Sequence, residues 1–348
     1  MPVTTAPVCV TGATGYVAGA IVQELLENGY SVRGTTRDPD RAWRERNVTG
    51  LPGADRRLDL VAADLMTPGA FDSAVEGCEY VIHTASPYVT DVADPYRDLV
   101  APAVNGTLSV LEACQAAGGV KRVVLTSSLA AITDEPDGRL LSERDWNTKS
   151  TLKRNAYYLS KTEAERSAWS FMEESHPEFD LVVINPPFVF GPSLIPALNT
   201  SARVLAGLTN GVFPGILDLQ WVIVDIRDLA TTHRLAIEVP TASGRYLTAA
   251  GVRSLRQVVD LLRANGWAER YRLPSIPLDN AVGNSLVKLA ANFQRAGARS
   301  YLKTHIGGVF RVDNSKVQKD LGIEFRDVDQ TVLEAMTDLE RWGHLGRK

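Results

Sequence analysis

Short apolar runs alternate with helical patterns through the first half of the chain. The apolar runs that we interpret as strands cover residues 8–11, 31–36, 57–62, 80–86 and 120–128, and a sixth begins at Leu181. Between them, apolar residues recur three and four positions apart, as on the buried face of a helix. This alternation predicts an α/β fold with a Rossmann-type, doubly wound parallel sheet, which binds ligands at the carboxyl ends of its strands.

The alternation weakens in the second half of the chain. Strands are expected near residues 220–224 and 245–248, and helices over 228–238, after Ser254, and over 279–298, 312–322 and 331–342. We expect residues 1–187 to form the Rossmann domain, with part of 225–250 returning to it. Residues 188–348 would then form mainly a smaller mixed lobe that binds substrate. Residues 133–153, rich in Asp, Glu, Pro and Gly, are expected to form an exposed excursion.

Composition narrows the class of protein. The chain has 348 residues, 45% of them hydrophobic, and a net charge of −4. These values are typical of a globular protein with a large core, and they argue against nucleic acid or an anionic membrane as the main partner. The N-terminus lacks a signal-like apolar segment, so we expect a cytoplasmic location. The cysteines Cys9, Cys78 and Cys114 show no paired spacing, which favours buried thiols over a disulfide or a metal site.

A glycine turn joins the first apolar run to the first helical pattern. Gly12-Ala-Thr-Gly15-Tyr-Val-Ala18 follows the strand expected at 8–11. Glycine permits a sharp turn close to a pyrophosphate, and the free N–H groups at a helix start attract the anion. The spacing departs from the Gly-x-Gly-x-x-Gly pattern. Its place in a strand–turn–helix unit nevertheless favours a dinucleotide site over an ordinary glycine turn.

The residues after the second apolar run bear on which dinucleotide binds. An acid at this point suits a ribose 2′-hydroxyl, whereas a cation suits a 2′-phosphate. Arg37 follows the run directly and Arg41 comes four residues later, so NADP is favoured over NAD. Asp38 is the counter-evidence, but because it precedes Pro39 we expect it to cap the next helix.

Polar residues stand where later strands end. Asp64 could accept a hydrogen bond from an adenine amino group, or could cap a helix that begins near Pro68. Ser127 and Ser128 end the fifth run, where a hydroxyl could donate to a substrate carbonyl or bond within a local turn. His83 lies inside an apolar strand and is expected to be a core histidine rather than a catalytic one.

Tyr157 and Lys161 form a candidate proton-transfer pair. On a helix over residues 156–174 they stand at i and i+4 and share one face, while Tyr158 remains a rival. A tyrosine in water titrates near ~10, and an ammonium group one turn away is expected to lower its pKa. By itself the pair is also consistent with an ordinary helix.

Eight segments, in this order, make the chain resemble extended short-chain dehydrogenase/reductases. Within that family the resemblance is to the branch of dihydroflavonol 4-reductases, cinnamoyl-CoA reductases and yeast-type aldehyde or methylglyoxal reductases, and it covers nearly the whole chain. The segments are Thr11-Gly-Ala-Thr-Gly-Tyr-Val-Ala18, His83-Thr-Ala-Ser-Pro87, Pro102-Ala-Val-Asn-Gly-Thr107, Arg122-Val-Val-Leu-Thr-Ser-Ser128, Tyr157-x-x-x-Lys161, Asn185-Pro-Pro-Phe-Val-Phe-Gly-Pro192, Asp225-Ile-Arg-Asp-Leu-Ala230 and Asp313-Asn-Ser-Lys316.

The resemblance implies an NADP(H)-dependent oxidoreductase that reduces a carbonyl group to an alcohol. It implies Tyr157 as the proton donor, Lys161 as the group that lowers the pKa of Tyr157 and holds the nicotinamide ribose, and Ser128 as the residue that orients the carbonyl. The implied cofactor contacts are Gly12, Ala13, Thr14, Gly15, Tyr16, Val17, Arg37, Arg41, Asp64, Leu65, Thr84, Ala85, Tyr157, Lys161, Pro187, Val189 and Ser201. Asn105 could order a proton-relay water, or could only bond to its own helix.

The substrate is the least determined part of the prediction. The pocket is expected to be lined by Tyr88, Leu129, Thr133, Phe188 and Trp221. Such an apolar pocket suits a small aromatic or aliphatic ketone or aldehyde, and it also leaves room for a flavonoid or cinnamoyl-type substrate. No metal is expected, and the protein would be a monomer or a homodimer. The other interpretations are a nucleotide-sugar epimerase or dehydratase and a non-catalytic NADP-sensing protein.

Overall fold

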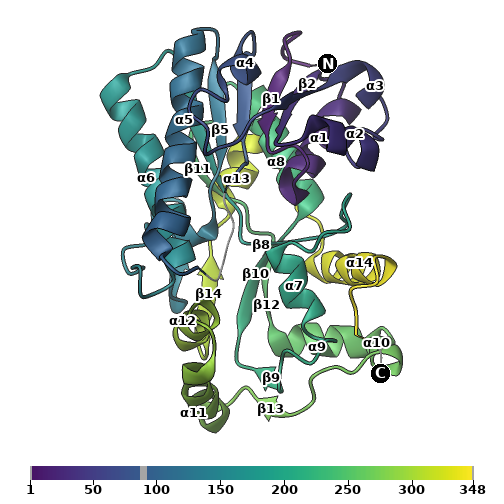
Figure 1. The fold of residues 1–348 in the computed structure, drawn as a ribbon. Coiled ribbons are helices and arrows are strands. Elements are labelled where there is room, and N and C mark those ends of the chain that lie inside the picture. Colours follow the sequence, from purple (N-terminus) through teal and green to yellow (C-terminus); the bar gives the residue numbers. More distant parts are fainter. Residues whose placement is uncertain (1, 87–91, 347–348) are drawn as a thin grey trace.

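A seven-stranded parallel sheet forms the centre of the larger part of the protein (Figure 1). The computed structural model describes residues 2–86 and 92–346. The strands, in the order in which they pair, are β11 (Gly244–Leu247), β7 (Asp180–Asn185), β5 (Arg122–Thr126), β4 (Tyr80–His83), β1 (Val8–Thr11), β2 (Val32–Thr36) and β3 (Leu58–Ala62). The chain progresses in opposite directions on the two sides of the β1–β4 pair, as in a doubly wound Rossmann sheet. The predicted fold class is confirmed.

Side chains of the strands alternate between two cores, one on each face of the sheet. In β1, Val8 and Val10 enter the core shared with α1 and α8, whereas Cys9 enters the core shared with α5 and α6. In β5, Val124 and Val123 divide in the same way. Because successive strand residues point to opposite faces, a sheet covered by helices on both sides reads as continuous apolar runs.

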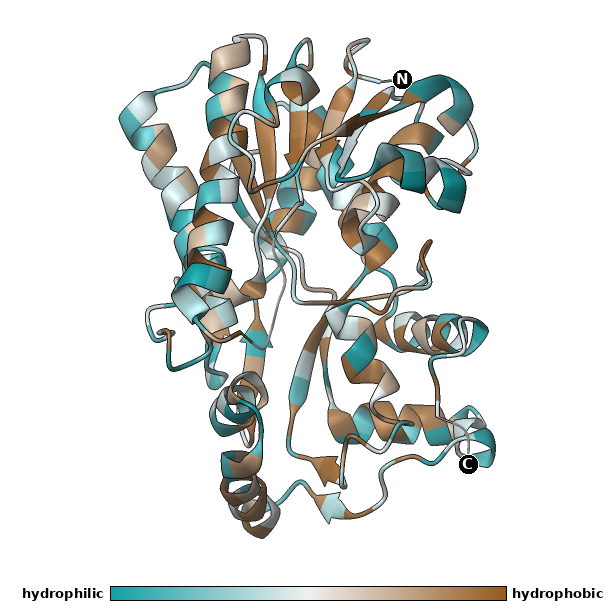
Figure 2. Ribbon diagram, in the orientation of Figure 1, coloured by the Kyte–Doolittle hydropathy of each residue, from teal (hydrophilic) through white to brown (hydrophobic). Residues whose placement is uncertain are grey.

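Helices cover both faces of this sheet, and their apolar stripes pack against the strands. Figure 2 colours the ribbons of these strands largely brown, which marks hydrophobic residues. The helices of the first face are α1 (Tyr16–Glu27), α8 (Ile226–Glu238) and α13 (Ser315–Leu321), with the short α2 (Pro39–Glu45) and α3 (Ala54–Arg57) beside β2 and β3. Those of the second face are α4 (Asp72–Val75), α5 (Ala101–Ala117), which a π-helical turn at Tyr96–Val100 precedes, and α6 (Ala156–Ser175).

The cysteines behave as small hydrophobic residues. Cys9, Cys78 and Cys114 are free and buried in the second of these cores, as predicted. Burial raises the pKa of all of these thiols, so they remain protonated. Across residues 2–86 and 92–346, no group of three or more His, Cys, Asp and Glu side chains is arranged to hold a metal ion. Within the same residues, the search for a helix of membrane-spanning length and apolarity finds none.

A smaller lobe has its own core, built around the fully buried Trp221. Its main sheet is β12 (Gly251–Ser254), β10 (Gln220–Asp225) and β8 (Phe188–Phe190), and its other elements are α7 (Thr200–Ala206), α9 (Leu255–Ala264), α10 (Trp267–Arg270), α14 (Val328–Arg341) and the pair β9 (Ile216–Leu217) and β13 (Pro277–Leu278). The region 279–298, expected as one helix, is divided. Its elements are α11 (Ala281–Ala290), a 3₁₀ turn at Ala291–Phe293 and the start of α12 (Ala296–His305).

The segment 133–153 is more buried than its composition suggested. It contains β6 (Asp137–Leu141), which pairs with β14 (Val309–Val312) near the C-terminus. Asp134, Leu141 and Asn147 are buried. Their polar groups are satisfied internally, because Asp134 accepts from Ser150 and the Asn147 amide donates to Ala130. The expectation of an exposed excursion therefore holds only in part, because residues such as Arg139 and Lys149 are exposed whereas these three are buried.

Candidate active site

The glycine turn has the shape that a dinucleotide site requires. Gly12 adopts φ +68°, and a Cβ atom there would lie 3.2 Å from the Cβ of Ala85. Gly15 caps the twelve-residue helix α1 without a side-chain hydrogen bond, so the first N–H groups of α1 are left for an anion. Ala13 is buried below the turn, Thr14 Oγ1 lies 3.5 Å from Thr36 Oγ1, and Val17 packs on the first core.

Hydrogen bonds to Thr11 join the ends of β1 and β4, next to the glycine turn. Its Oγ1 accepts from the N–H groups of Thr84 at 3.1 Å and Ala85 at 3.0 Å, and lies 2.8 Å from Nδ1 of His83. Burial, assisted by the charge of Lys161, lowers the pKa of His83 to about 3. His83 is thus a neutral core histidine, as predicted. Together with the hydrogen bonds of Thr11, its contact holds the ends of β1 and β4 at the crevice in which a dinucleotide would lie.

The two candidate arginines differ in their surroundings. Asp38 caps α2 by accepting from the N–H of Arg41 at 2.9 Å, as predicted. The guanidinium of Arg41 is engaged by Glu45, with Nε 2.6 Å from the carboxylate. Arg37 is exposed at the end of β2 and forms no salt bridge to any described residue. Arg37 is therefore the better placed of the two to bind a phosphate.

The loop after β3 is held by a turn rather than by a helix cap. Asp64 Oδ1 accepts from the N–H of Met66 at 2.9 Å, and the next helix begins only at Asp72, so of the two alternatives for Asp64 the cap of a helix near Pro68 is wrong. Leu65 packs closely on Gly106 of α5, where a Cβ atom would lie 3.1 Å from its Cδ2. Asn105 lies exposed on the same helix.

The proposed catalytic side chains meet at the carboxyl ends of the strands. Ser128, which follows β5, and Tyr157, near the start of α6, line the same cleft. Lys161 lies one turn further along α6, and its Nζ donates to Ser86 Oγ at 3.1 Å. Burial lowers the pKa of Lys161 to about 8. Ser128 Oγ accepts from the N–H of Ala130 at 3.1 Å, which fixes its orientation.

A buried ion pair lies behind this group. Glu165, one turn beyond Lys161, has a fully buried side chain, and its carboxylate accepts from Arg245 Nε of β11 at 2.5 Å. The same carboxylate accepts from Ser127 Oγ at 2.5 Å and from the Asn185 amide at 2.8 Å, and that amide also lies 3.2 Å from the carbonyl oxygen of Ser128. Glu165 therefore links the helix of Tyr157 to the ends of β5, β7 and β11.

Arg245 also orders the buried part of the segment 133–153. Its guanidinium lies 3.9 Å from the ring centroid of Trp146 and donates to the carbonyl oxygens of Glu143 and Asp145. Sequence reasoning missed both Glu165 and Arg245. The available signal was an acid that continues the i, i+4 spacing of Tyr157 and Lys161, and an arginine inside a buried strand.

The cleft beside Tyr157 contains about 620 Å³ of space not filled by protein. The predicted residues Leu129, Thr133 and Phe188 line it, as do Pro187 and Ser201. The sequence analysis did not place Tyr158, Ala130, Thr200, Val222, Tyr301, His305 and Phe310 in the lining, although the structure does. The cleft wall thus draws on both the sheet domain and the lobe.

Two predicted pocket residues do not appear in this lining. Tyr88 lies outside the described residues. Trp221 is 1% exposed and packs in the lobe core, 6.1 Å from the ring of Phe188, while its neighbour Val222 faces the cleft. Val189 is buried behind the cleft, where its N–H donates to Ser201 Oγ at 3.2 Å.

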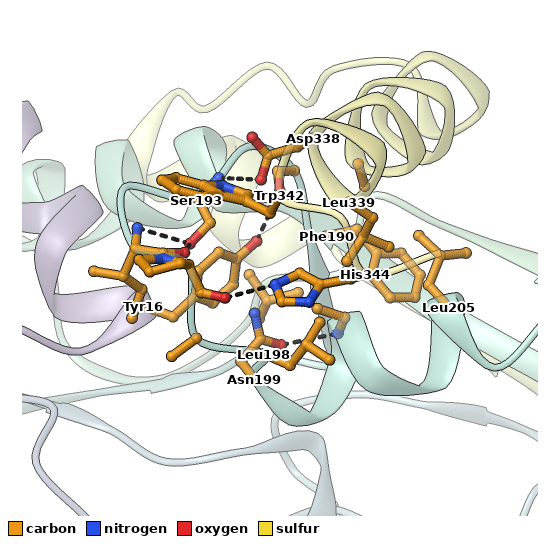
Figure 3. A pocket seen from close by; sticks show the side chains of 17 residues that line it. Tyr16, Phe190, Ser193, Leu198, Asn199, Leu205, Asp338, Leu339, Trp342 and His344 are labelled. Carbon is orange, nitrogen blue, oxygen red and sulfur yellow. Dashed lines mark hydrogen bonds between the residues drawn. The ribbon is translucent and has the colours of Figure 1, made fainter. Parts of the chain in front are cut away.

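A second cavity lies between the loop that follows β8, α7 and α14 (Figure 3). The Tyr16 side chain turns into it and donates to the carbonyl oxygen of Gly191 at 3.2 Å, while Ser193 N–H donates to Asp338 at 2.9 Å. His344 Nε2 lies 2.6 Å from the carbonyl oxygen of Pro196. These bonds join the C-terminal helix to the loop, so we interpret this cavity as a packing interface. Because its hydroxyl bonds to Gly191, the side chain of Tyr16 points away from the glycine turn.

Comparison with known proteins places these features in context. Residues 8–247 match the family described as the NAD dependent epimerase/dehydratase family. The chain is 38% identical to cinnamoyl-CoA reductase CAD2 of Medicago truncatula over 341 residues, which are 96% of this chain and 95% of that protein. It is 37% identical to tetraketide alpha-pyrone reductase 1 of Arabidopsis thaliana over 347 residues, 97% of this chain and 96% of that one.

Solved structures show the same similarity. The structure of yeast methylglyoxal/isovaleraldehyde reductase Gre2, complexed with NADPH, matches with a TM-score of 0.79 and 30% identity, over 97% of this chain and all of that one. The corresponding NADPH complex from Candida albicans matches with a TM-score of 0.80 and 28% identity, covering 97% of this chain and 99% of that chain.

Proposed function

The chain belongs to the NAD dependent epimerase/dehydratase family, within the extended short-chain dehydrogenase/reductases, and we propose that it is an NADPH-dependent carbonyl reductase. The observation that carries this proposal is the cleft in which Ser128 and Tyr157 meet, with Lys161 one turn behind them. Its relatives are named as reductases of cinnamoyl-CoA, of a tetraketide alpha-pyrone and of methylglyoxal or isovaleraldehyde, and reduction of a carbonyl group is a reaction that all of these compounds can undergo.

Each of the three residues has a distinct role in this proposal. The Tyr157 hydroxyl donates a proton to the carbonyl oxygen as the alcohol forms. Lys161 stabilises the phenolate that remains and holds the ribose of the cofactor. Ser128 donates a hydrogen bond to the carbonyl oxygen, which orients it and stabilises its developing negative charge. NADPH, when bound, supplies the hydride that is added to the carbonyl carbon.

The residues present fit NADPH as the cofactor. At Gly12 the positive φ and the close approach of Ala85 both disfavour a side chain, and the start of α1 offers uncapped N–H groups to a pyrophosphate. Arg37, which has no salt bridge to a described residue, would bind the 2′-phosphate. Thr36, the last residue of β2, is uncharged and places no negative charge against that phosphate.

The alternatives fit the cleft less well. A nucleotide-sugar epimerase or dehydratase has to bind a diphosphate in the lobe, but the described residues that line the cleft include neither lysine nor arginine. A non-catalytic NADP sensor would not need Ser128, Tyr157 and Lys161 to converge. A cinnamoyl-type thioester or a flavonoid remains within the proposed activity, because both are carbonyl substrates.

A carbonyl panel assayed with both cofactors tests the proposal. Purified protein is expected to oxidise NADPH, and NADH far more slowly, when offered small aryl ketones and aldehydes. Absorbance of the reduced cofactor gives the rates, and NADPH affinity is measured separately by fluorescence. Tight NADPH binding without turnover across the panel would instead support the sensor interpretation.

A further inference from the structure

A polar cluster lies beyond Tyr157 in the cleft wall. Tyr157 contacts Tyr158 edge-on with ring centroids 6.1 Å apart, and Tyr158 contacts His305 of α12 in the same way at 5.8 Å. His305 stacks on Tyr301, one helical turn earlier, at 4.1 Å. All of these residues contribute to the lining of the cleft, beside the proposed proton donor.

The hydrogen bonds of His305 favour one tautomer. Nδ1 lies 3.1 Å from the carbonyl oxygen of Tyr301, which can only accept, so we assign the ring proton to Nδ1. Nδ1 is also 2.8 Å from Thr304 Oγ1, whose own proton reaches the carbonyl oxygens of Ser300 and Tyr301. Burial, as the main cause, lowers the pKa of His305 to about 4, so the ring is neutral at pH 7. Nε2 is therefore a hydrogen-bond acceptor.

Two polar atoms of this cluster, Nε2 of His305 and the hydroxyl of Tyr301, have a weak partner or none among the described residues. Nε2 of His305 lies 3.4 Å from the Tyr158 hydroxyl, which is long for a hydrogen bond. The hydroxyl of Tyr301 is buried and has no hydrogen-bond partner among the described residues. His305 itself is only 2% exposed. Because buried polar groups in proteins are nearly always paired, the cluster is suited to a ligand group that both donates and accepts.

Asn155 holds this cluster in a fixed position relative to Tyr157. It precedes α6 with φ +50°, a conformation that costs free energy in a non-glycine residue and therefore needs support from its surroundings. Its N–H donates to Ser300 Oγ at 2.8 Å, and its amide donates to Thr304 Oγ1 at 3.2 Å. These partners directly precede Tyr301 and His305 on α12. The distance from the reacting carbonyl to the cluster is thus constrained by the fold.

On the basis of the reductase activity proposed above, we propose that Tyr301 and His305 form a subsite for a hydroxyl group on the substrate, remote from the reacting carbonyl. The substrate hydroxyl donates to Nε2 of His305 and accepts from the Tyr301 hydroxyl. The carbon skeleton between the two polar groups then lies against the apolar part of the cleft, which consists of Leu129, Phe188, Val222 and Phe310. The favoured substrates are hydroxylated carbonyl compounds.

A matched pair of ketones tests this subsite. The pair is 4-(4-hydroxyphenyl)butan-2-one and 4-phenylbutan-2-one, in which two methylene groups insulate the carbonyl from the ring, so the hydroxyl does not alter its reactivity. We expect kcat/KM with NADPH to be about tenfold higher for the hydroxylated ketone, as two neutral hydrogen bonds would give. His305→Phe should reduce this ratio to about one. His305→Gln keeps an acceptor and should retain part of the ratio, and Tyr301→Phe should lower it by a smaller factor.

The control substitution is His344→Phe, in the second cavity, where the ratio should stay at its wild-type value. A wild-type ratio near one, or an unchanged ratio in His305→Phe, would overturn the subsite while leaving the reductase proposal intact. Absence of NADPH oxidation with either ketone would count against the reductase proposal instead. In that case the ratio of the two dissociation constants, measured calorimetrically with NADP⁺ present, decides on the subsite. If His305→Phe does not fold, His305→Gln and Tyr301→Phe decide.

Discussion

Two charged residues one turn apart on α6 differ sharply in their surroundings. Glu165 is buried with a full set of partners, because Arg245 supplies the counter-charge and Ser127 and Asn185 supply hydrogen bonds. Lys161 is half-buried, its Nζ donates to the hydroxyl of Ser86, and no described carboxylate forms a salt bridge to it. Burial is accordingly the cause that lowers the pKa of Lys161.

The difference in partners distinguishes a charge that supports the fold from a charge that binds a ligand. A buried charge with a complete set of partners holds the fold together, whereas a half-buried, partly desolvated charge without a counter-ion lowers stability until a ligand supplies its missing interactions. We therefore interpret Glu165 and Arg245 as the support that positions Ser128 and Tyr157. Lys161 is then a residue whose interactions are completed by the ribose of the cofactor and by the phenolate of Tyr157.

The largest expected effect concerns the turn that carries the proposed chemistry. Tyr157→Phe removes the proton donor and should lower kcat by about 10²- to 10⁴-fold, because general acid catalysis typically contributes that much. NADPH affinity should remain within several-fold, as measured by fluorescence titration. Tyr158→Phe is the matched control and should keep most of the activity. The opposite result, an active Tyr157→Phe and an inactive Tyr158→Phe, would mean that the wrong phenol has been assigned.

Removing the counter-charge on the supporting side should reduce stability. Glu165→Gln leaves the guanidinium of Arg245, 7% exposed, without its carboxylate, and should lower the free energy of unfolding by about 3–5 kcal/mol. Urea denaturation of the purified variant measures the change. Glu163→Gln, on the same helix, removes only an exposed pair with Arg166 and should change the value by less than about 1 kcal/mol. Equal stability of the two variants would show that the buried pair has no special role.

Removing the charge of Lys161, on the cofactor side of α6, should raise the free energy of unfolding rather than lower it. The pKa of Lys161 is lowered to about 8, so charging it in the folded protein costs free energy at pH 7. Lys161→Met should therefore raise the free energy of unfolding by up to about 3 kcal/mol, since one pKa unit corresponds to 1.36 kcal/mol, while abolishing activity.

The pH dependence of wild-type stability provides a second measurement of the free-energy cost of charging Lys161 in the folded protein. Between pH 8 and about 10.4 the unfolded chain binds more protons at Lys161 than the folded one, so this lysine's contribution makes stability rise with pH across that window. The difference between wild type and Lys161→Met should accordingly shrink over the same range. A Met variant that is less stable than wild type at neutral pH would contradict this account.

The elements that the sequence predicted well are those encoded locally. The glycine turn, the cap at Asp38 and the helix of Tyr157 depend on residues within a few positions of one another. The pairing of Glu165 with Arg245 joins residues 80 positions apart, and no local pattern reports it. Trp221 shows that a prediction of pocket residues can be wrong by a single position. A shift of one residue along β10 moves a side chain from the lobe core to the cleft, where Val222 lies.

The smallest effect on activity should come from substitutions of Arg37 and Arg41, at the far end of the cofactor crevice. These two arginines show the same contrast as Lys161 and Glu165, because one lacks an ion-pair partner and the other has one. Arg37 has no salt bridge to a described residue, whereas Arg41 is bound to Glu45. Arg37→Ala should raise the KM for NADPH by about tenfold, because a hydrogen bond to a charged group contributes about 1.5–3 kcal/mol, and the exposed position reduces that value. The KM for NADH, which has no 2′-phosphate, should stay the same. Arg41→Ala should change either value by less than about threefold, since its guanidinium is already engaged. Loss of discrimination between the cofactors in Arg41→Ala would contradict this assignment. It would mean that the ion pair between Arg41 and Glu45 opens when NADPH binds. The absence of a salt bridge would then not identify the arginine that binds the 2′-phosphate.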